Sequence, residues 1–231
     1  MIAPGVWLKR LLLAVIGLLL LYQFWLFGWV LWWNWVNPES TRFMDIRLAE
    51  LRVAEPQARL QQRWIGYGQI SPNLKRAIVA AEDGKFLDHE GFDWEGIQNA
   101  IEKNQKKGRV VAGGSTISQQ LAKNLFLSPA KTPLRKAEEA VITLMLEAVW
   151  SKRRILEVYL NVIEWGSGVF GAEAAARHYF GIAASQLSAE QAARLAAMVP
   201  RPRFYDRNRN APALAAKSEV ILARMRSAAV P

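Results

Sequence analysis

The sequence predicts a mainly α-helical protein with one transmembrane helix near its N-terminus, and three observations lead to this class. An uncharged apolar stretch comes first, and the rest of the chain shows apolar residues at helical spacing without a clear run of alternating strand pattern. Gly and Pro separate the helical segments. The 231 residues are enough for a membrane anchor and one domain with a hydrophobic core.

The first element is the transmembrane helix. No charged residue occurs between Leu11 and Pro38. A bilayer core requires about 20 apolar residues, so we predict that residues 11–36 span a membrane. Lys9 and Arg10 precede the span. The positive-inside rule therefore keeps the N-terminus in the cytoplasm and places everything after the span on the opposite side.

A cleaved signal peptide is the alternative to a permanent anchor, but the apolar region of such a peptide is shorter and ends in small residues. The far end of this span is instead crowded with aromatic residues, as at a membrane interface: Trp29, Trp32, Trp33 and Trp35. The chain then divides in order into a cytoplasmic N-terminus, a span, a connecting segment and one extracytoplasmic domain: residues 1–10, 11–36, 37–68 and 69–231.

The composition favours an anionic partner. There are no cysteines, which excludes a disulfide framework and a thiolate nucleophile. Without the two cations of the anchor, the 30 basic side chains become 28, against 20 acidic ones. Such an excess suits nucleic acid, anionic lipid head groups or a phosphorylated substrate, or it is simply a solvated surface. The predicted topology makes nucleic acid the least favoured of these, so we expect no nucleic-acid partner.

Helix signals recur along the domain. Ser71 and Pro72 are a favourable start, because Ser caps a helix and Pro is tolerated at its first position, and Gly84 ends that helix. Thr116 and Gln119 form a capping box ahead of an apolar stripe. The remaining predicted helices show comparable start and stop signals: 94–106, 133–150, 152–162, 171–180 and 188–199.

A carboxylate interrupts the apolar face of the first of these helices. Leu74 and Ile78 are four residues apart, and the next step along the same face is Glu82, which Asp83 follows. Apolar neighbours raise the pKa of a carboxyl group towards neutrality, which suits a general base or acid. The alternative is that a Glu at the end of a helix bends back into solvent.

A basic cluster follows the capped helix. Lys123 lies on that helix, and "KTPLRKAEE" adds Lys131, Arg135 and Lys136. Arg135 and Glu139 are four residues apart and share a helix face, so a structural ion pair is one interpretation. The functional interpretation is that these cations converge on a diphosphate, which Arg can bind with two hydrogen bonds and Lys as a compact charge.

The start of the capped helix could also face an anion, since its amides are unsatisfied around Gly114 to Thr116. This turn lacks the Gly-Lys-Ser/Thr ending of a P-loop, so nucleotide binding is not indicated.

Four segments together resemble the peptidoglycan glycosyltransferases, which are the polymerase domains of class A penicillin-binding proteins and their single-domain relatives. In chain order these segments are "EDGKFLDHEG" (82–91), "GGSTISQQLAKN" (113–124), "RKAEE" (135–139) and "ILEVYLNVIEWG" (155–166). The resemblance covers about residues 65–205. It implies a lysozyme-like, α-helical glycosyltransferase domain that polymerises lipid II, a disaccharide-pentapeptide carried on undecaprenyl diphosphate.

The resemblance also implies roles for particular residues. Glu82 matches the general base that deprotonates the acceptor's 4-hydroxyl, and Glu139 matches a second essential carboxylate whose role is less settled. Lys123 matches a diphosphate contact, and Lys131 stands where some relatives carry Arg. The same motifs supply the other expected substrate-binding residues: Asp83, Ser115, Gln119, Gln120, Arg135 and Lys136.

The implied reaction inverts the donor's anomeric centre, forms a β-1,4 bond and releases undecaprenyl diphosphate. A diphosphate is already a good leaving group, so the site needs cations more than a second carboxylic acid. No cofactor is required, and although Mg²⁺ or Mn²⁺ can assist at a diphosphate, no cluster of ligands in the sequence demands a metal. The expected partners are lipid II, the growing glycan chain and the lipids of a bacterial inner membrane, with the domain in the periplasm. The sequence leaves open an association with a transpeptidase or a divisome protein.

Two other functions remain possible from the sequence: a hydrolase or lytic enzyme that cuts glycan strands, and a non-catalytic scaffold that recruits wall-synthesis partners.

The Ser-x-x-Lys at Ser128 to Lys131 is a chance match to transpeptidases, whose other motifs are absent. We expect a structural hydrogen bond for His89 instead of a metal ligand. "RPRFYDRNRN" (201–210) is interpreted as a basic loop facing solvent or head groups, and "NLFLSPA" (124–130) as either core and turn or an interfacial segment.

Overall fold

The computed structural model describes residues 4–109 and 113–231, and the chain divides into two compact units, Met1–Pro38 and Glu39–Pro231. The first unit contains helix α1 (Pro4–Trp33). Its segment Trp7–Trp33 is long and apolar enough to cross a membrane, with a mean hydropathy of 2.2. Aromatic rings follow one another along one face of this helix at four-residue spacing: Trp25, Trp29 and Trp33.

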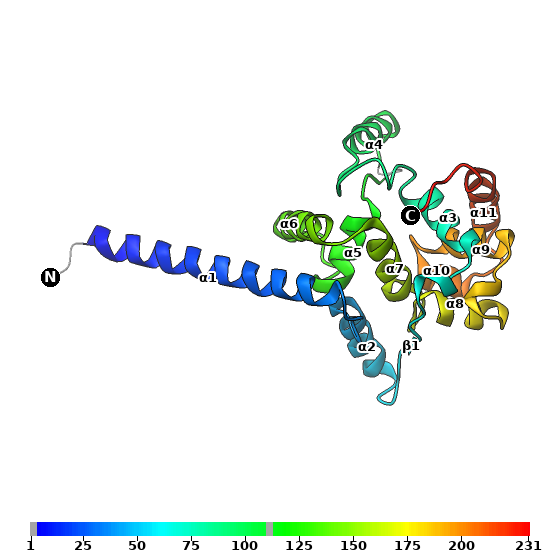
Figure 1. Ribbon diagram of the computed structural model, residues 1–231, viewed down its shortest axis with the longest axis horizontal. Helices are drawn as coiled ribbons and strands as arrows, with labels where there is room; N and C mark the ends of the chain where they lie inside the picture. The colour runs from blue at the N-terminus through cyan, green and yellow to red at the C-terminus, as the bar shows by residue number, and fades with distance from the viewer. Residues whose placement is uncertain (1–3, 110–112) are drawn as a thin grey trace. The chain divides into compact units, whose positions relative to one another are not determined.

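The second unit is built mainly from helices, as the sequence predicts (Figure 1). In chain order they are α2 (Arg42–Ala54), α3 (Pro72–Glu82), α4 (Trp94–Lys107), α5 (Ile117–Phe126), α6 (Pro133–Val149), α7 (Lys152–Val162), α8 (Ala172–Phe180), α9 (Ala189–Met198), α10 (Pro202–Arg207) and α11 (Pro212–Arg224). Two short 3₁₀ turns, Tyr67–Gln69 and Ala184–Gln186, complete the helical part.

Side-chain caps set the starts of the predicted helices. Ser71 accepts a hydrogen bond from the Asn73 amide at the start of α3. The predicted capping box of α5 is confirmed, because Thr116 accepts from the Gln119 amide and the Gln119 side chain accepts from the Thr116 amide. Each of these bonds satisfies a backbone N–H that has no partner within the helix.

Three helices were not predicted from the sequence. Helix α2 lies in the segment 37–68, which the sequence suggested only connects the anchor to the domain. Helix α10 lies in the basic segment 201–210 that was interpreted as a loop, and that interpretation was wrong over its six helical residues. Neither α10 nor α11 has a capping side chain, and the only start signal of each is a proline at its first position, Pro202 and Pro212.

A small sheet completes the described part of this unit. Its strands are β1 (Gln61–Gln62), β2 (Glu164–Gly166) and β3 (Val169–Phe170), in the order β1-β3-β2. Strand β1 pairs parallel to β3, and β2 pairs antiparallel to it. The turn between β2 and β3 contains Gly168 at a φ of 73°, a conformation that Gly adopts without strain. Strands of two or three residues are too short to show an alternating pattern.

The helices form two packed groups that meet at the functional site. Helix α5 packs against α2, α6 and α7, whereas α9 packs against α3 and α11. Figure 1 shows α5, α6 and α7 together on one side of this unit, and α3, α9 and α11 on the other. Trp150, Tyr159 and Trp165 belong to the core of this unit, because all three are buried. The C-terminal end of α3 meets α5 between the two groups, where Glu82 and Asp83 accept hydrogen bonds from α5.

Candidate active site

Glu82 is the last residue of α3 and lies where its helix leaves the core. Ile78 and Leu74, one and two turns earlier, are fully buried, so the predicted apolar face leads directly to this carboxylate. Gln120 of α5 donates a hydrogen bond from Nε2 to Glu82 Oε2 over 2.8 Å. Burial raises the pKa of Glu82, against the lowering effects of the Gln120 hydrogen bond and the charges of Lys217 and Lys123. The raised pKa makes this carboxylate a better proton acceptor than an ordinary exposed one.

Gln120 is itself held in place from behind. The hydroxyl of Tyr159 donates to Gln120 Oε1 over 2.9 Å, which directs the amide nitrogen of Gln120 towards Glu82. Burial raises the pKa of Tyr159 well above its usual value, so its hydroxyl remains a donor at physiological pH. Tyr159, Gln120 and Glu82 thus form one directed chain of hydrogen bonds that fixes the orientation of the carboxylate.

Asp83 ties the end of α3 to the start of α5. Its Oδ2 accepts a hydrogen bond from the Ile117 amide over 3.0 Å, and its Oδ1 lies 2.9 Å from His89 Nε2. The expectation of a structural hydrogen bond for His89 is therefore confirmed. Burial raises the pKa of Asp83, against the hydrogen bonds from His89 and Ile117. Both oxygens already have partners, so the Asp83 carboxylate links the end of α3 to α5 and to His89.

Glu139 organises the cations at the start of α6. It is buried and accepts hydrogen bonds from Arg135 Nη1 and Lys136 Nζ. The ion pair that the sequence left open for Arg135 and Glu139 is thus present. These three residues also line the same cavity as Glu82 and Lys123, so the pair stands inside the site instead of on a remote surface.

Lys123 of α5 is half-buried between the two carboxylates. Burial lowers its pKa, whereas the charges of Glu139 and Glu82 raise it. Its Nζ lies 6.0 Å from the centre of the Phe43 ring. Lys131 is exposed and lines a neighbouring cavity together with Lys123. Gln119, in contrast, is buried and occupied by the capping box, so the structure does not bring it to the site surface.

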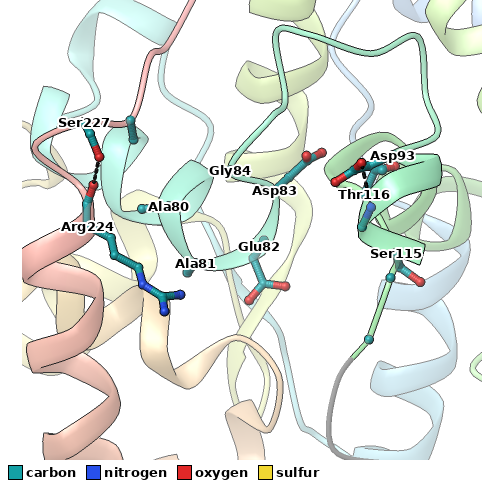
Figure 2. Close-up of a pocket in the computed structure, with 14 residues that line it drawn as sticks. Ala80, Ala81, Glu82, Asp83, Gly84, Asp93, Ser115, Thr116, Arg224 and Ser227 are labelled. Carbon is teal, nitrogen blue, oxygen red and sulfur yellow. Dashed lines mark hydrogen bonds between the residues drawn. The ribbon is translucent and has the colours of Figure 1, made fainter. Parts of the chain in front are cut away.

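Neighbouring cavities share lining residues and form one groove through the site. A cavity of about 410 Å³ carries mainly carboxylate, hydroxyl and glycine groups, including Glu82, Asp93 and Ser115. A second cavity, of about 420 Å³, shares Glu82 and Ser115 but is lined by the cations of α5 and α6. Figure 2 shows Glu82 turned into the space between Ser115 on one wall and Arg224 on the other.

Two basic residues of α11 belong to the site but were missed in the sequence. Arg224 lines the first cavity. Burial lowers the pKa of Lys217, and the nearby charge of Glu82 opposes this shift. Lys217 follows Leu214 by three residues and precedes Ile221 by four, and both of these are buried. This is the same interruption of an apolar face that drew attention to Glu82, so the signal was available.

The arrangement places one sheltered carboxylate beside a cluster of cations in a single cavity. The family model described as transglycosylase matches residues 49–226, and the chain therefore belongs to the transglycosylase family. The mainly α, lysozyme-like fold expected from the sequence motifs is confirmed by this membership. Among residues 4–109 and 113–231, no three His, Asp or Glu side chains gather as potential metal ligands.

Individual relatives are similar over nearly the whole chain. The biosynthetic peptidoglycan transglycosylase of Dechloromonas aromatica is 71% identical over 227 residues, which cover 98% of both chains. The protein of that name from Nitrosospira multiformis is 65% identical over 97% of this chain and 98% of its own length. The one from Laribacter hongkongensis is 64% identical over 97% of this chain and 99% of its own length.

Proposed function

We propose that this protein is a peptidoglycan glycosyltransferase that polymerises lipid II into β-1,4-linked glycan strands. Membership of the transglycosylase family and the names of its relatives support the reaction class. The single observation that carries the mechanism is the position of Glu82. Its carboxylate lies where a cavity of hydroxyl and carboxylate groups meets a cavity of cations.

The reaction requires a base next to a sugar hydroxyl and cations next to a diphosphate. Glu82 takes the proton of the acceptor's 4-hydroxyl, and the oxygen attacks the anomeric carbon of the donor. The bond from that carbon to the diphosphate oxygen breaks, and its electron pair leaves with undecaprenyl diphosphate. Attack opposite the departing group inverts the centre from α to β. Gln120 orients Glu82 for the transfer.

The cations stabilise the charge that develops on the leaving group. Lys123, Arg135 and Lys136 line the cavity beside Glu82 and offer donors to a diphosphate. Glu139 holds Arg135 and Lys136 by direct hydrogen bonds, which gives this carboxylate a positioning role. Lys131, in the adjoining cavity, adds a further charge on the path of the lipid carrier.

The membrane anchor fits a lipid-linked substrate. A single N-terminal helix of sufficient length and apolarity supports single-pass anchoring. With Lys9 and Arg10 on the cytoplasmic side, the domain lies in the periplasm of a bacterial inner membrane and serves cell-wall biogenesis and cell shape. The inner-membrane lipids and the growing glycan chain are its partners, and its reaction requires no metal or other cofactor.

Incubating the purified full-length protein with labelled lipid II tests this proposal. We expect a ladder of glycan polymer that lysozyme degrades. Cleavage of preformed glycan while lipid II stays monomeric would replace the proposal with a hydrolase. Binding of lipid II without any turnover would leave a scaffold function instead.

A further inference from the structure

Helix α2 contributes to the groove although it begins outside the region that defines the family. The family match starts at residue 49, so the first half of α2, with Phe43 and Arg47, precedes it. Helix α2 nevertheless packs against α5, the helix that carries Gln120 and Lys123. The buried side chains Phe43 and Met44 belong to this half of the helix. The packing therefore brings residues from outside the matched region to the edge of the site.

Phe43 connects Arg47 with Lys123. The guanidinium carbon of Arg47 lies 4.7 Å from the centre of the Phe43 ring, and Lys123 Nζ lies 6.0 Å from it. Two cations near one aromatic ring are attracted to its electron-rich face, which holds them near each other despite their like charge. Arg47 thus extends the row of cations in the groove beyond Lys123.

Two carboxylates hold the guanidinium of Arg47 in place. Nη1 donates to Glu50 Oε2 over 2.7 Å, and Nε lies 3.3 Å from Glu164 Oε2 in an ion pair. The side chain of Glu164 is only 5% exposed. Glu164 Oε1 lies 3.9 Å from Arg203 Nε, so this carboxylate is shared between two arginines. These ion pairs fix the position of the Arg47 guanidinium at the wall of the groove.

The charge of this part of the groove favours an anionic ligand. A cavity of about 310 Å³ is lined by Arg47, Lys123 and Lys131, with Glu164 as its carboxylate. The adjoining cavity of about 470 Å³ shares Arg47 and Glu164 and adds three arginines: Arg201, Arg203 and Arg207. Cations therefore outnumber carboxylates along the groove on the side of Lys123 that leads away from Glu82.

The proposed reaction supplies a reason for a second anionic site. It joins two lipid-linked molecules, and each carries a diphosphate. The donor's diphosphate leaves from the carbon that reacts, so it lies close to Glu82. The acceptor keeps its own diphosphate, which is one disaccharide away from the hydroxyl that Glu82 deprotonates. The groove must therefore bind one diphosphate near Glu82 and another farther along.

We propose that Arg47 binds the diphosphate of the acceptor lipid in the cavity that adjoins Lys123. This inference rests on the proposed function and adds a binding residue from α2 to it. Glu164 and Glu50 hold the guanidinium at the wall of the cavity that Lys123 and Lys131 also line. The acceptor lipid then lies along the groove, with its 4-hydroxyl at Glu82 and its diphosphate between Lys123 and Arg47.

Separate kinetics for donor and acceptor test this assignment. Lipid II whose 4-hydroxyl is chemically blocked can act only as donor, so it is coupled to unblocked lipid II and the first product is measured. We expect Arg47→Ala to raise the half-saturating concentration of acceptor about tenfold, as loss of a charged hydrogen bond does, with little change for the donor. Arg47→Lys keeps the charge, so its half-saturating concentration of acceptor should lie between those of the wild type and Arg47→Ala. Arg42→Ala, an exposed cation on the same helix, is the matched control and changes neither constant.

A structural role for Arg47 gives a different pattern. Removing Arg47 alone leaves Glu164 buried without its partner, so the double variant Arg47→Met with Glu164→Gln is measured as well. If this variant keeps the wild-type Tm and still shows the rise for acceptor alone, the assignment holds. An equal rise for donor and acceptor, or no rise in a folded variant, overturns it. A wild-type protein that makes no coupled product rejects the proposed function itself.

Discussion

Gln120 of α5 donates a hydrogen bond to Glu82 of α3 across the two groups of helices, with 2.8 Å between Nε2 and Oε2. Because Tyr159 occupies the carbonyl oxygen of Gln120, the amide nitrogen faces Glu82 and stabilises its charged form. The bond lowers the pKa of Glu82 while burial raises it. Two opposing effects therefore set the pKa of Glu82: burial, and the hydrogen bond from Gln120 of α5.

Gln120→Ala should shift the pH dependence of the reaction. Loss of the hydrogen bond raises the pKa of Glu82 further, and only the deprotonated carboxylate accepts a proton. We therefore expect the acid limb of kcat/KM to move to higher pH, with a lower rate at pH 6 than at pH 8 relative to the wild type. A pH–rate profile on lipid II measures this. An acid limb at the wild-type position would show that Gln120 does not tune the base.

Glu82→Gln should become more stable relative to the wild type as the pH rises. Burial raises the pKa of Glu82 in the folded protein, so the folded state binds this proton more tightly than the unfolded chain. The resulting stability is complete below the unfolded pKa, about 4.3, and is lost as the pH rises through the folded value. Thermal unfolding in detergent at pH 4 and pH 8 gives the comparison. A difference in Tm that does not grow with pH contradicts the raised pKa.

Lys123→Ala should weaken binding of the donor more than Lys131→Ala does. Lys123 is half-buried beside Glu82, whereas Lys131 is exposed and better screened by solvent. We expect about a tenfold rise in the half-saturating donor concentration for Lys123→Ala, together with a slower reaction, and a smaller change for Lys131→Ala. Steady-state kinetics of the two variants side by side provide the test. Equal rises in the two variants would contradict the claim that Lys123 contributes more to donor binding than Lys131.

Chelation of divalent ions should leave the rate unchanged. Lys and Arg side chains line the cavity that is proposed for the leaving diphosphate, so its charge is neutralised without a metal. Polymerisation of lipid II is measured in buffer with excess EDTA. A large loss of rate that Mg²⁺ or Mn²⁺ restores would mean that an ion takes part in the step.

Local signals in the sequence were sufficient for part of the site. The interrupted stripe from Leu74 through Ile78 identified Glu82, and the capping box at Thr116 fixed the phase of the helix that presents Gln120 and Lys123. Both signals act within a few residues of the chain. Helix periodicity and caps are the features that a single sequence shows most directly.

Local sequence signals do not predict contacts between segments that are distant in the chain. Arg47 reaches the groove only because α2 packs on α5, and Lys217 reaches Glu82 only because α11 packs on α3. Gln119 was expected at the substrate and instead serves the cap of its own helix, since both tasks use the same amide group. Which face of a helix meets a neighbour depends on tertiary packing, and a single sequence does not show that packing.

Polymerisation of lipid II by Glu82→Gln is the most direct test of the central claim, that Glu82 is the base. Glu90→Gln, an exposed carboxylate of the same motif, serves as the matched control. The account predicts that Glu82→Gln folds, binds lipid II and makes no polymer, whereas Glu90→Gln makes polymer at the wild-type rate. Polymer formed by Glu82→Gln at a rate close to that of the wild type would contradict it.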